Sequence, residues 1–261
     1  MIFEKLAADV ARRLAVVEEI WKARLEIDMA GMVRGARARL EEHLSLTPLP
    51  LDPDLAEKHG PFGVGRIATH AWQAPGFRKV VLSEISLEPP RIPMIDNFAL
   101  PLINGFAIVL APEMTVKAPL FACDFMALPT RISVNADDYA SSDLRSQFAV
   151  GFGPRDDAPH SGGVASALES DQGPSWLRAL ASGHGLHAKV SLREVGDAFA
   201  ALMVHLGAYL EASRGAAKGV DGARSQQIFF EAFHVHGPRV GPLAQVFGKP
   251  WAERYSRILF E

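Results

Sequence analysis

The sequence predicts an α+β fold in which helices cover an antiparallel sheet. Three observations predict it: a long helical pattern opens the chain, β-rich segments follow one another from about residue 63 to about residue 136, and helical patterns fill the C-terminal part. No helical pattern separates the β-rich segments, and consecutive strands of this kind pair as an antiparallel meander rather than as parallel βαβ units.

The first 44 residues have the pattern of a long amphipathic helix. Apolar residues recur at three-to-four spacing from Leu6 to Met29, with Arg, Lys and Glu between them. We therefore divide the chain into an N-terminal helical extension, residues 1–47, and a main domain, residues 48–261. The extension either docks on its own domain or forms a homodimer contact, and the sequence favours docking.

Five segments, each bounded by Pro, Gly, Asn or Asp, form the predicted sheet. They are GVGRIATHAWQAP, FRKVVLSEISL, INGFAIVLAP, PLFACDFMAL and TRISVNAD. Alternation along the second segment puts Ser83 and Glu84 on opposite faces, and we expect Glu84 on the solvated one.

Helical periodicity returns in the C-terminal part of the chain. EVGDAFAALMVHLGAYLEASR is amphipathic and ends near Gly215, QQIFFEAFHVH stops at Gly237-Pro238, and PLAQVFGKPWAERYSRILF closes the chain. LHAKV, which precedes the first of these helices, predicts a turn or a strand.

Composition is typical of a soluble globular protein of the cytoplasm. The 261 residues are 48% hydrophobic and 22% charged, and the net charge of −3 gives no basic field for nucleic acid. The single cysteine excludes an internal disulfide and any multi-cysteine metal site. Pro, Asp or Asn interrupts the apolar stretches well before roughly 18 residues, so no membrane-spanning helix is expected.

Asp124 is the strongest candidate for chemistry. It lies in APLFACDFMALP, an otherwise apolar segment that predicts a buried strand. Burial raises the pKa of a carboxyl group, so such an acid holds a proton near neutral pH and can deliver it. The alternative is a structural carboxylate at a strand edge, satisfied by the backbone or by an arginine.

A second cluster of titratable residues lies in FHVHGPR, where a predicted helix stops. His234, His236 and Arg239 are either directed into a cavity or part of a surface loop, and their spacing is a weak match to a zinc site. His184 and His187, in SGHGLHAKV, carry still less weight.

Five segments carry a resemblance to a known family. LPLDPDLAEKHGPFGVGR, APGFRKVVL, PLFACD, ISVNADDY and FGKPWAERYSRILFE together resemble the ferredoxin-dependent bilin reductases in order and approximate spacing, over roughly residues 48–261. The resemblance implies a three-layer α/β/α sandwich that binds biliverdin or a related bilin between the sheet and the C-terminal helices. It also implies an oxidoreductase that takes single electrons from reduced ferredoxin and holds no cofactor or metal of its own.

The resemblance assigns roles to individual residues. Asp124 falls on the family's central proton donor, and Ala107, or Asn104 in another register, falls where the family has a histidine paired with that acid. His236 and Gly237 stand where the family has an Asn-Asp or similar pair, and His236 could replace the missing function, because an unperturbed histidine titrates near a pKa of about 6.5. Residues expected to contact the bilin, including a lysine at the family's propionate-binding arginine, are Ser83, Asn104, Ala107, Met126, Lys189, His234 and Arg239.

The sequence leaves three functions open. The first is a bilin-reductase-like enzyme that uses ferredoxin as electron donor, with Asp124 and His236 as proton donors. The second is a bilin-binding protein that does not catalyse, linked to haem degradation. The third is an unrelated α+β binding or scaffold protein.

Overall fold

The computed structural model describes the chain in stretches separated by gaps. They are residues 26–61, 65–87, 103–128, 131–139, 185–219, 221–236 and 241–260, without the side chains of 138, 221, 234–236, 241, 242 and 260. The described strands are β1 (Thr47–Pro48), β2 (Glu57–His59), β3 (Arg66–Ala74), β4 (Phe77–Leu87), β5 (Ile103–Pro112), β6 (Leu120–Ala127), β7 (Ile132–Tyr139) and β8 (Leu186–Val190). The helices are α2 (Met29–His43), α3 (Pro53–Ala56), the 3-10 turn η3 (Leu192–Glu194), α7 (Val195–Arg214), α8 (Asp221–His236), α9 (Gly241–Phe247) and α10 (Lys249–Phe260).

The strands form one antiparallel sheet in the order β1-β3-β4-β5-β6-β7-β8, with β2 also paired to β3. The order from β3 to β8 follows the chain, so the predicted meander is confirmed. Its first hairpin turns at Pro75-Gly76, where Gly76 has a φ of 83°. Proline presets the first central residue of such a turn, and glycine adopts the left-handed second one without strain.

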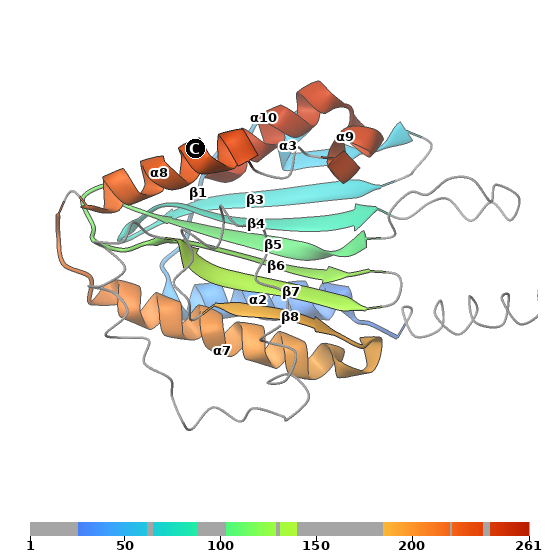
Figure 1. The fold of residues 1–261 in the computed structure, drawn as a ribbon, viewed down its shortest axis with the longest axis horizontal. Helices are drawn as coiled ribbons and strands as arrows, with labels where there is room; N and C mark the ends of the chain where they lie inside the picture. Colours follow the sequence, from blue (N-terminus) through green and yellow to red (C-terminus); the bar gives the residue numbers. More distant parts are fainter. Residues whose placement is uncertain are drawn as a thin grey trace, which may run out of the picture.

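Helices cover both faces of the sheet. Figure 1 shows α2 and α7 on one side of the sheet and α8, α9 and α10 on the other. The predicted α+β fold, a three-layer α/β/α sandwich, is therefore confirmed. In the described part of the chain, none of the helices has the length and apolar character needed to cross a membrane.

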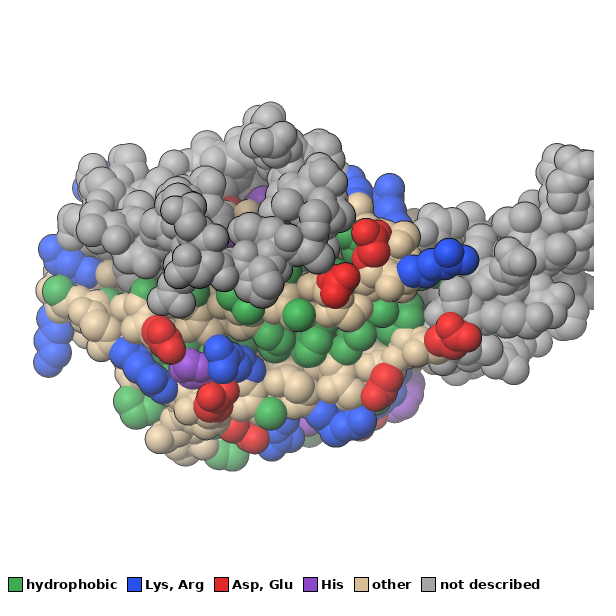
Figure 2. Space-filling model, turned by 90° about the horizontal axis from the view of Figure 1, so that it is seen from below, with side chains coloured by type: hydrophobic (Ala, Val, Ile, Leu, Met, Phe, Trp, Pro, Cys, Tyr) green, Lys and Arg blue, Asp and Glu red, His purple; other side chains and the backbone are tan. Residues whose placement is uncertain are grey.

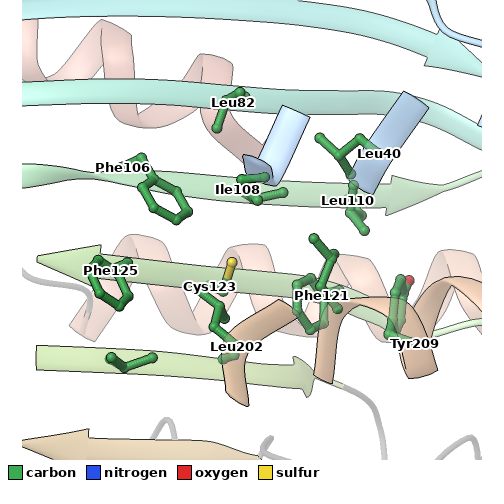
Figure 3. Close-up of a cluster of buried hydrophobic side chains, with 14 of the residues drawn as sticks. Leu40, Leu82, Phe106, Ile108, Leu110, Phe121, Cys123, Phe125, Leu202 and Tyr209 are labelled. Carbon is green, nitrogen blue, oxygen red and sulfur yellow. The ribbon is translucent and has the colours of Figure 1, made fainter. Parts of the chain in front are cut away.

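The face under α2 and α7 holds the largest hydrophobic core. Phe106 on β5, Phe125 on β6 and Leu202 on α7 are completely buried there (Figure 3). Phe106 and Phe125 stack with their ring centroids 5.6 Å apart, and Phe199 meets both rings edge-on. Cys123 points into the same core, and burial raises the pKa of its thiol, which keeps it unreactive.

The described part of the N-terminal extension belongs to this core. Helix α2 begins at Met29, because the Asp28 side chain accepts a hydrogen bond from the Gly31 amide and caps the first turn. The predicted helix is thus confirmed over Met29–His43, Ile27 and Asp28 precede it, and residues 1–25 lie outside the described residues. Gly35 lets α2 approach Phe199 of α7 closely. The homodimer contact stays a prediction.

The outer side of this layer is mixed in charge. Figure 2, which views the molecule from the side of α7, shows Lys and Arg side chains interspersed with Asp and Glu and with hydrophobic side chains. Along α2, Arg37 pairs with Glu41 at 2.8 Å and Arg39 with Glu42 at 2.7 Å. Exposed pairs of this kind contribute little to stability because solvent screens them, so the apolar inner face holds α2 in place.

Polar anchors fix the helices of the opposite layer. The Arg78 guanidinium donates two hydrogen bonds to Oε1 of Gln226 on α8, and the Lys79 ammonium donates to the Ile258 carbonyl of α10 at 2.9 Å. The Trp251 indole donates to the Asp54 carbonyl at 2.8 Å. Arg78 and Lys79 thereby hold α8 and α10 against the sheet.

Candidate functional site

Polar side chains form a row across the sheet on the face that α8, α9 and α10 cover. The strand register places one residue from each of six strands side by side: Thr69, Ser83, Ala107, Asp124, Asn135 and His187. Because the side chains of directly paired residues on neighbouring strands point to the same face of a sheet, all six project to the same side. The row brings together groups that lie 118 residues apart in the chain, from Thr69 to His187.

The middle of this row is accessible, whereas the opposite face is sealed. Facing α2 and α7, the central side chains of β5, β6 and β7 have exposed fractions of 0–4%. On the row's own face, Val109 and Asp137 are buried, but six side chains nearer the middle are only partly buried: Ala107, Ala122, Asp124, Met126, Ser133 and Asn135. A central sheet face that its covering helices leave partly open is a place where a ligand can lie.

Asp124 stands in the middle of the row on β6, an interior strand. Its Oδ1 accepts a hydrogen bond of 3.0 Å from the Asn135 amide nitrogen. Burial raises the pKa of Asp124 from 3.8 to about 6, and the Asn135 hydrogen bond and the nearby His187 ring limit the rise. The alternative of an edge carboxylate paired with arginine does not describe this residue, since β6 lies between β5 and β7. Asp124 is an acid that holds its proton close to neutral pH.

His187 and Asp137 extend the row toward the sheet edge at β8. One ring nitrogen of His187, Nδ1, lies 3.4 Å from Oδ1 of Asn135, and the other, Nε2, lies 3.1 Å from Oδ2 of Asp137. The Asp137 side chain is 1% exposed and the His187 side chain 14%. A side chain at Gly185 would meet Asp137 within 2.3 Å, so glycine leaves the space that this pair needs.

The other end of the row is a buried group of hydroxyls. The hydroxyls of Thr69 and Ser83 lie 3.2 Å apart, and the Tyr255 ring of α10 packs over this region. Burial raises the pKa of Tyr255, and the two hydroxyls partly offset this rise. Since Ser83 is 0% exposed, it shapes the floor of the site rather than contacting a ligand directly.

The structure brings some of the predicted site residues together. Met126 and Lys189 flank the row on the same face, because both pair with Ser133. Ala107 lies directly beside Asp124. Asn104 does not join them, because an odd step along β5 turns it to the face of α2 and α7.

The second predicted cluster falls largely outside the described residues. His234 and His236 belong to the last turn of α8, but their side chains lie outside the description, as does Arg239. Glu84 lies as expected on the face opposite Asp124, with its side chain 35% exposed and 3.9 Å from His70.

The sequence did not lead us to predict Asn135 or Asp137 as site residues, and it indicated His187 only as a weak candidate. A local signal existed for two of them. In ISVNADDY the polar residues Asn135 and Asp137 alternate with apolar ones, which predicts a polar face on that strand. No local signal singles out His187, because its neighbours come from the pairing of β8 with β7.

The raised pKa of Asp124 predicts a pH-dependent stability. The folded chain binds this proton more tightly than the unfolded chain, so the contribution of Asp124 to stability falls as pH rises from about 4 to about 6. We expect Asp124→Asn to stabilise the protein by about 1–3 kcal/mol at neutral pH, with little effect below pH 4. Urea unfolding at both pH values measures this, with Glu84→Gln as the control on the opposite face. Equal pH dependence in Asp124→Asn and wild type would contradict it.

Fold and row together define a three-layer sandwich with a titratable, partly open sheet face. No family model and no curated protein matches the sequence. Among solved structures, the fold is similar to phytochromobilin synthase from tomato in complex with biliverdin, with a TM-score of 0.62 and 14% sequence identity. The match covers 87% of this chain and 82% of that chain. At this identity the likeness shows a shared fold.

Proposed function

We propose that the chain binds a linear tetrapyrrole such as biliverdin on the open sheet face and reduces it. The observation that carries the proposal is Asp124, an acid with a pKa of about 6 on a partly open face. The similar fold of a phytochromobilin synthase solved with biliverdin supports the choice of ligand.

The proposed chemistry needs electrons from outside and protons from the chain. A two-electron reduction of one double bond takes up two electrons and two protons, and we propose reduced ferredoxin as the electron donor. Asp124 supplies one proton, because an acid with a pKa near the working pH transfers its proton most efficiently, and we propose His236, the other proton donor that the sequence predicts, as the source of the second. Met126 and Ala107 provide apolar contact beside it, and Lys189 offers a cation for a bilin propionate.

A second candidate is a protein that binds a bilin without reducing it. The observation that favours it is Ala107. This residue lies beside Asp124 on β5 and carries no titratable group, so that side of the acid has no second proton donor.

Anaerobic spectroscopy tests both candidates. The purified protein is mixed with biliverdin, the absorption spectrum is recorded, and reduced ferredoxin is then added. The proposal expects a spectral shift on mixing and a further change on electron supply. A shift without turnover supports the binder. A spectrum identical to free biliverdin rules out both candidates and leaves an unrelated binding or scaffold protein.

A further inference from the structure

A chain of hydrogen bonds connects Asp124 to His187 across three strands. Asn135 stands between them on β7, with its amide nitrogen 3.0 Å from the Asp124 carboxyl and its amide oxygen 3.4 Å from His187 Nδ1. Asp137 holds the other ring nitrogen at 3.1 Å. The Asp137 side chain is itself buried, with 1% exposed, and its contact with Nε2 fixes the orientation of the His187 ring.

The amide of Asn135 restricts which protons the two ends can carry. An asparagine side chain presents donors on its nitrogen and an acceptor on its oxygen. When the nitrogen donates to ionised Asp124, the oxygen faces His187 Nδ1, which must then carry a hydrogen. The Asp137 carboxylate requires a hydrogen on Nε2 as well. An ionised Asp124 therefore goes with a doubly protonated His187.

Rotating the amide by half a turn gives the complementary state. The amide oxygen then accepts a hydrogen bond from a protonated Asp124, and the amide nitrogen donates to a bare Nδ1 of His187. Nε2 keeps its hydrogen for Asp137. The two states hold the same number of protons. An ionised Asp124 together with a bare Nδ1 is disfavoured, because both acceptors then need a hydrogen from the same amide nitrogen.

We propose that Asn135 couples the protonation of Asp124 to that of His187, so that the loss of a proton by one favours its retention by the other, which makes His187 a positioning residue that sets how readily the acid is reprotonated. When Asp124 gives its proton to a ligand, the bare Nδ1 no longer matches the network, and His187 takes up one proton from water. His187 then releases this proton to water, Asp124 takes one up from water on the partly open face, and the amide of Asn135 rotates to match the new state without carrying a proton itself. Only the identity of the proton acceptor depends on the proposed bilin reduction.

Other ionisable groups surround this unit. On the same side of the sheet they include Arg78, Lys79, Asp137, Tyr139, Lys189 and Tyr255. Asp137 contacts His187 directly, whereas Arg78 and Lys79 are bound to α8 and α10. Lys189 lies two residues from His187 on the same face. Every variant in the test keeps Lys189, so its charge is the same throughout.

The test is an infrared pH titration of Asp124 without any bilin. The band of the protonated carboxyl is identified by its loss in Asp124→Asn, and its midpoint is expected at about 6 in the wild type. We expect His187→Gln to raise this midpoint by about one pH unit, because the cation that favours ionised Asp124 is gone. Asp137→Asn, a variant of the same shape, should shift the midpoint in the same direction. His70→Gln, the same exchange on the other face of the sheet, should leave it unchanged.

A double-variant cycle separates coupling through Asn135 from a charge acting through space. In an Asn135→Leu background, His187→Gln should shift the midpoint by much less than it does in the wild type. An equal shift in both backgrounds, or no shift in the wild type, overturns the proposal. A confirmed cycle in a protein that fails to bind biliverdin leaves the coupling intact and removes only the bilin function.

Discussion

Replacing Asp124 with asparagine is expected to slow biliverdin reduction by about 100-fold or more, the usual contribution of a positioned general acid. Asparagine keeps the size of the side chain and an oxygen that can accept the hydrogen bond from Asn135, so binding of biliverdin should persist. The variant has no carboxyl group and therefore cannot donate a proton to the bilin. Single-turnover absorption spectroscopy with reduced ferredoxin measures the rate, and the spectral shift on mixing reports binding.

The pH profile of the same reaction gives an independent check. A general acid acts in its protonated form, so wild-type turnover should fall as pH rises through the Asp124 pKa of about 6. This decline should be missing from the residual activity of Asp124→Asn. Glu84→Gln removes a carboxylate from β4, two strands away from β6 and on the other face, and should behave as wild type. Wild-type rates in Asp124→Asn would exclude this residue from the mechanism.

The fold was predictable because its signals are local. FRKVVLSEISL and INGFAIVLAP correspond to β4 and β5 residue for residue, since turn residues bracket each β-rich run and fix its ends. Helix α7 begins one residue after its predicted start and ends at its predicted last residue. The sequence has no helical pattern between the predicted strands, and this sufficed to predict their antiparallel order.

Only one residue of the polar row could be predicted from the sequence pattern itself, because its polarity differs from that of its neighbours in the sequence. Asp124 could be identified because a carboxylate is unusual in an apolar strand. Its partners could not, because they depend on pairing between distant segments: Asn135 and His187 are 52 residues apart in the chain. The sequence predicted the partner position of Asp124 at Ala107, on the β5 side. The polar partners in the structure lie on the β7 side.

Replacing Phe106 with alanine is expected to lower the free energy of unfolding by about 3–5 kcal/mol. The ring is 0% exposed, stacks on Phe125 and meets Phe199 edge-on, so its removal leaves a cavity that three elements border. A loss of this size is a large share of the roughly 5–15 kcal/mol that stabilises a typical domain. Urea unfolding measures it, and Val204→Ala, at a side chain 53% exposed on α7, should stay within about 0.5 kcal/mol of wild type.

Phe106 also separates the two faces of the sheet. It adjoins Ala107 in the chain but projects to the opposite side, away from Asp124. The milder variant Phe106→Leu should therefore lower stability while leaving the infrared midpoint of Asp124 at about 6. Asn135→Leu should do the reverse, with a small effect on stability and a clear rise of that midpoint, because the hydrogen bond to the ionised acid is lost. If Phe106→Leu moves the midpoint as far as Asn135→Leu does, the acid depends on packing of the whole sheet rather than on its own row.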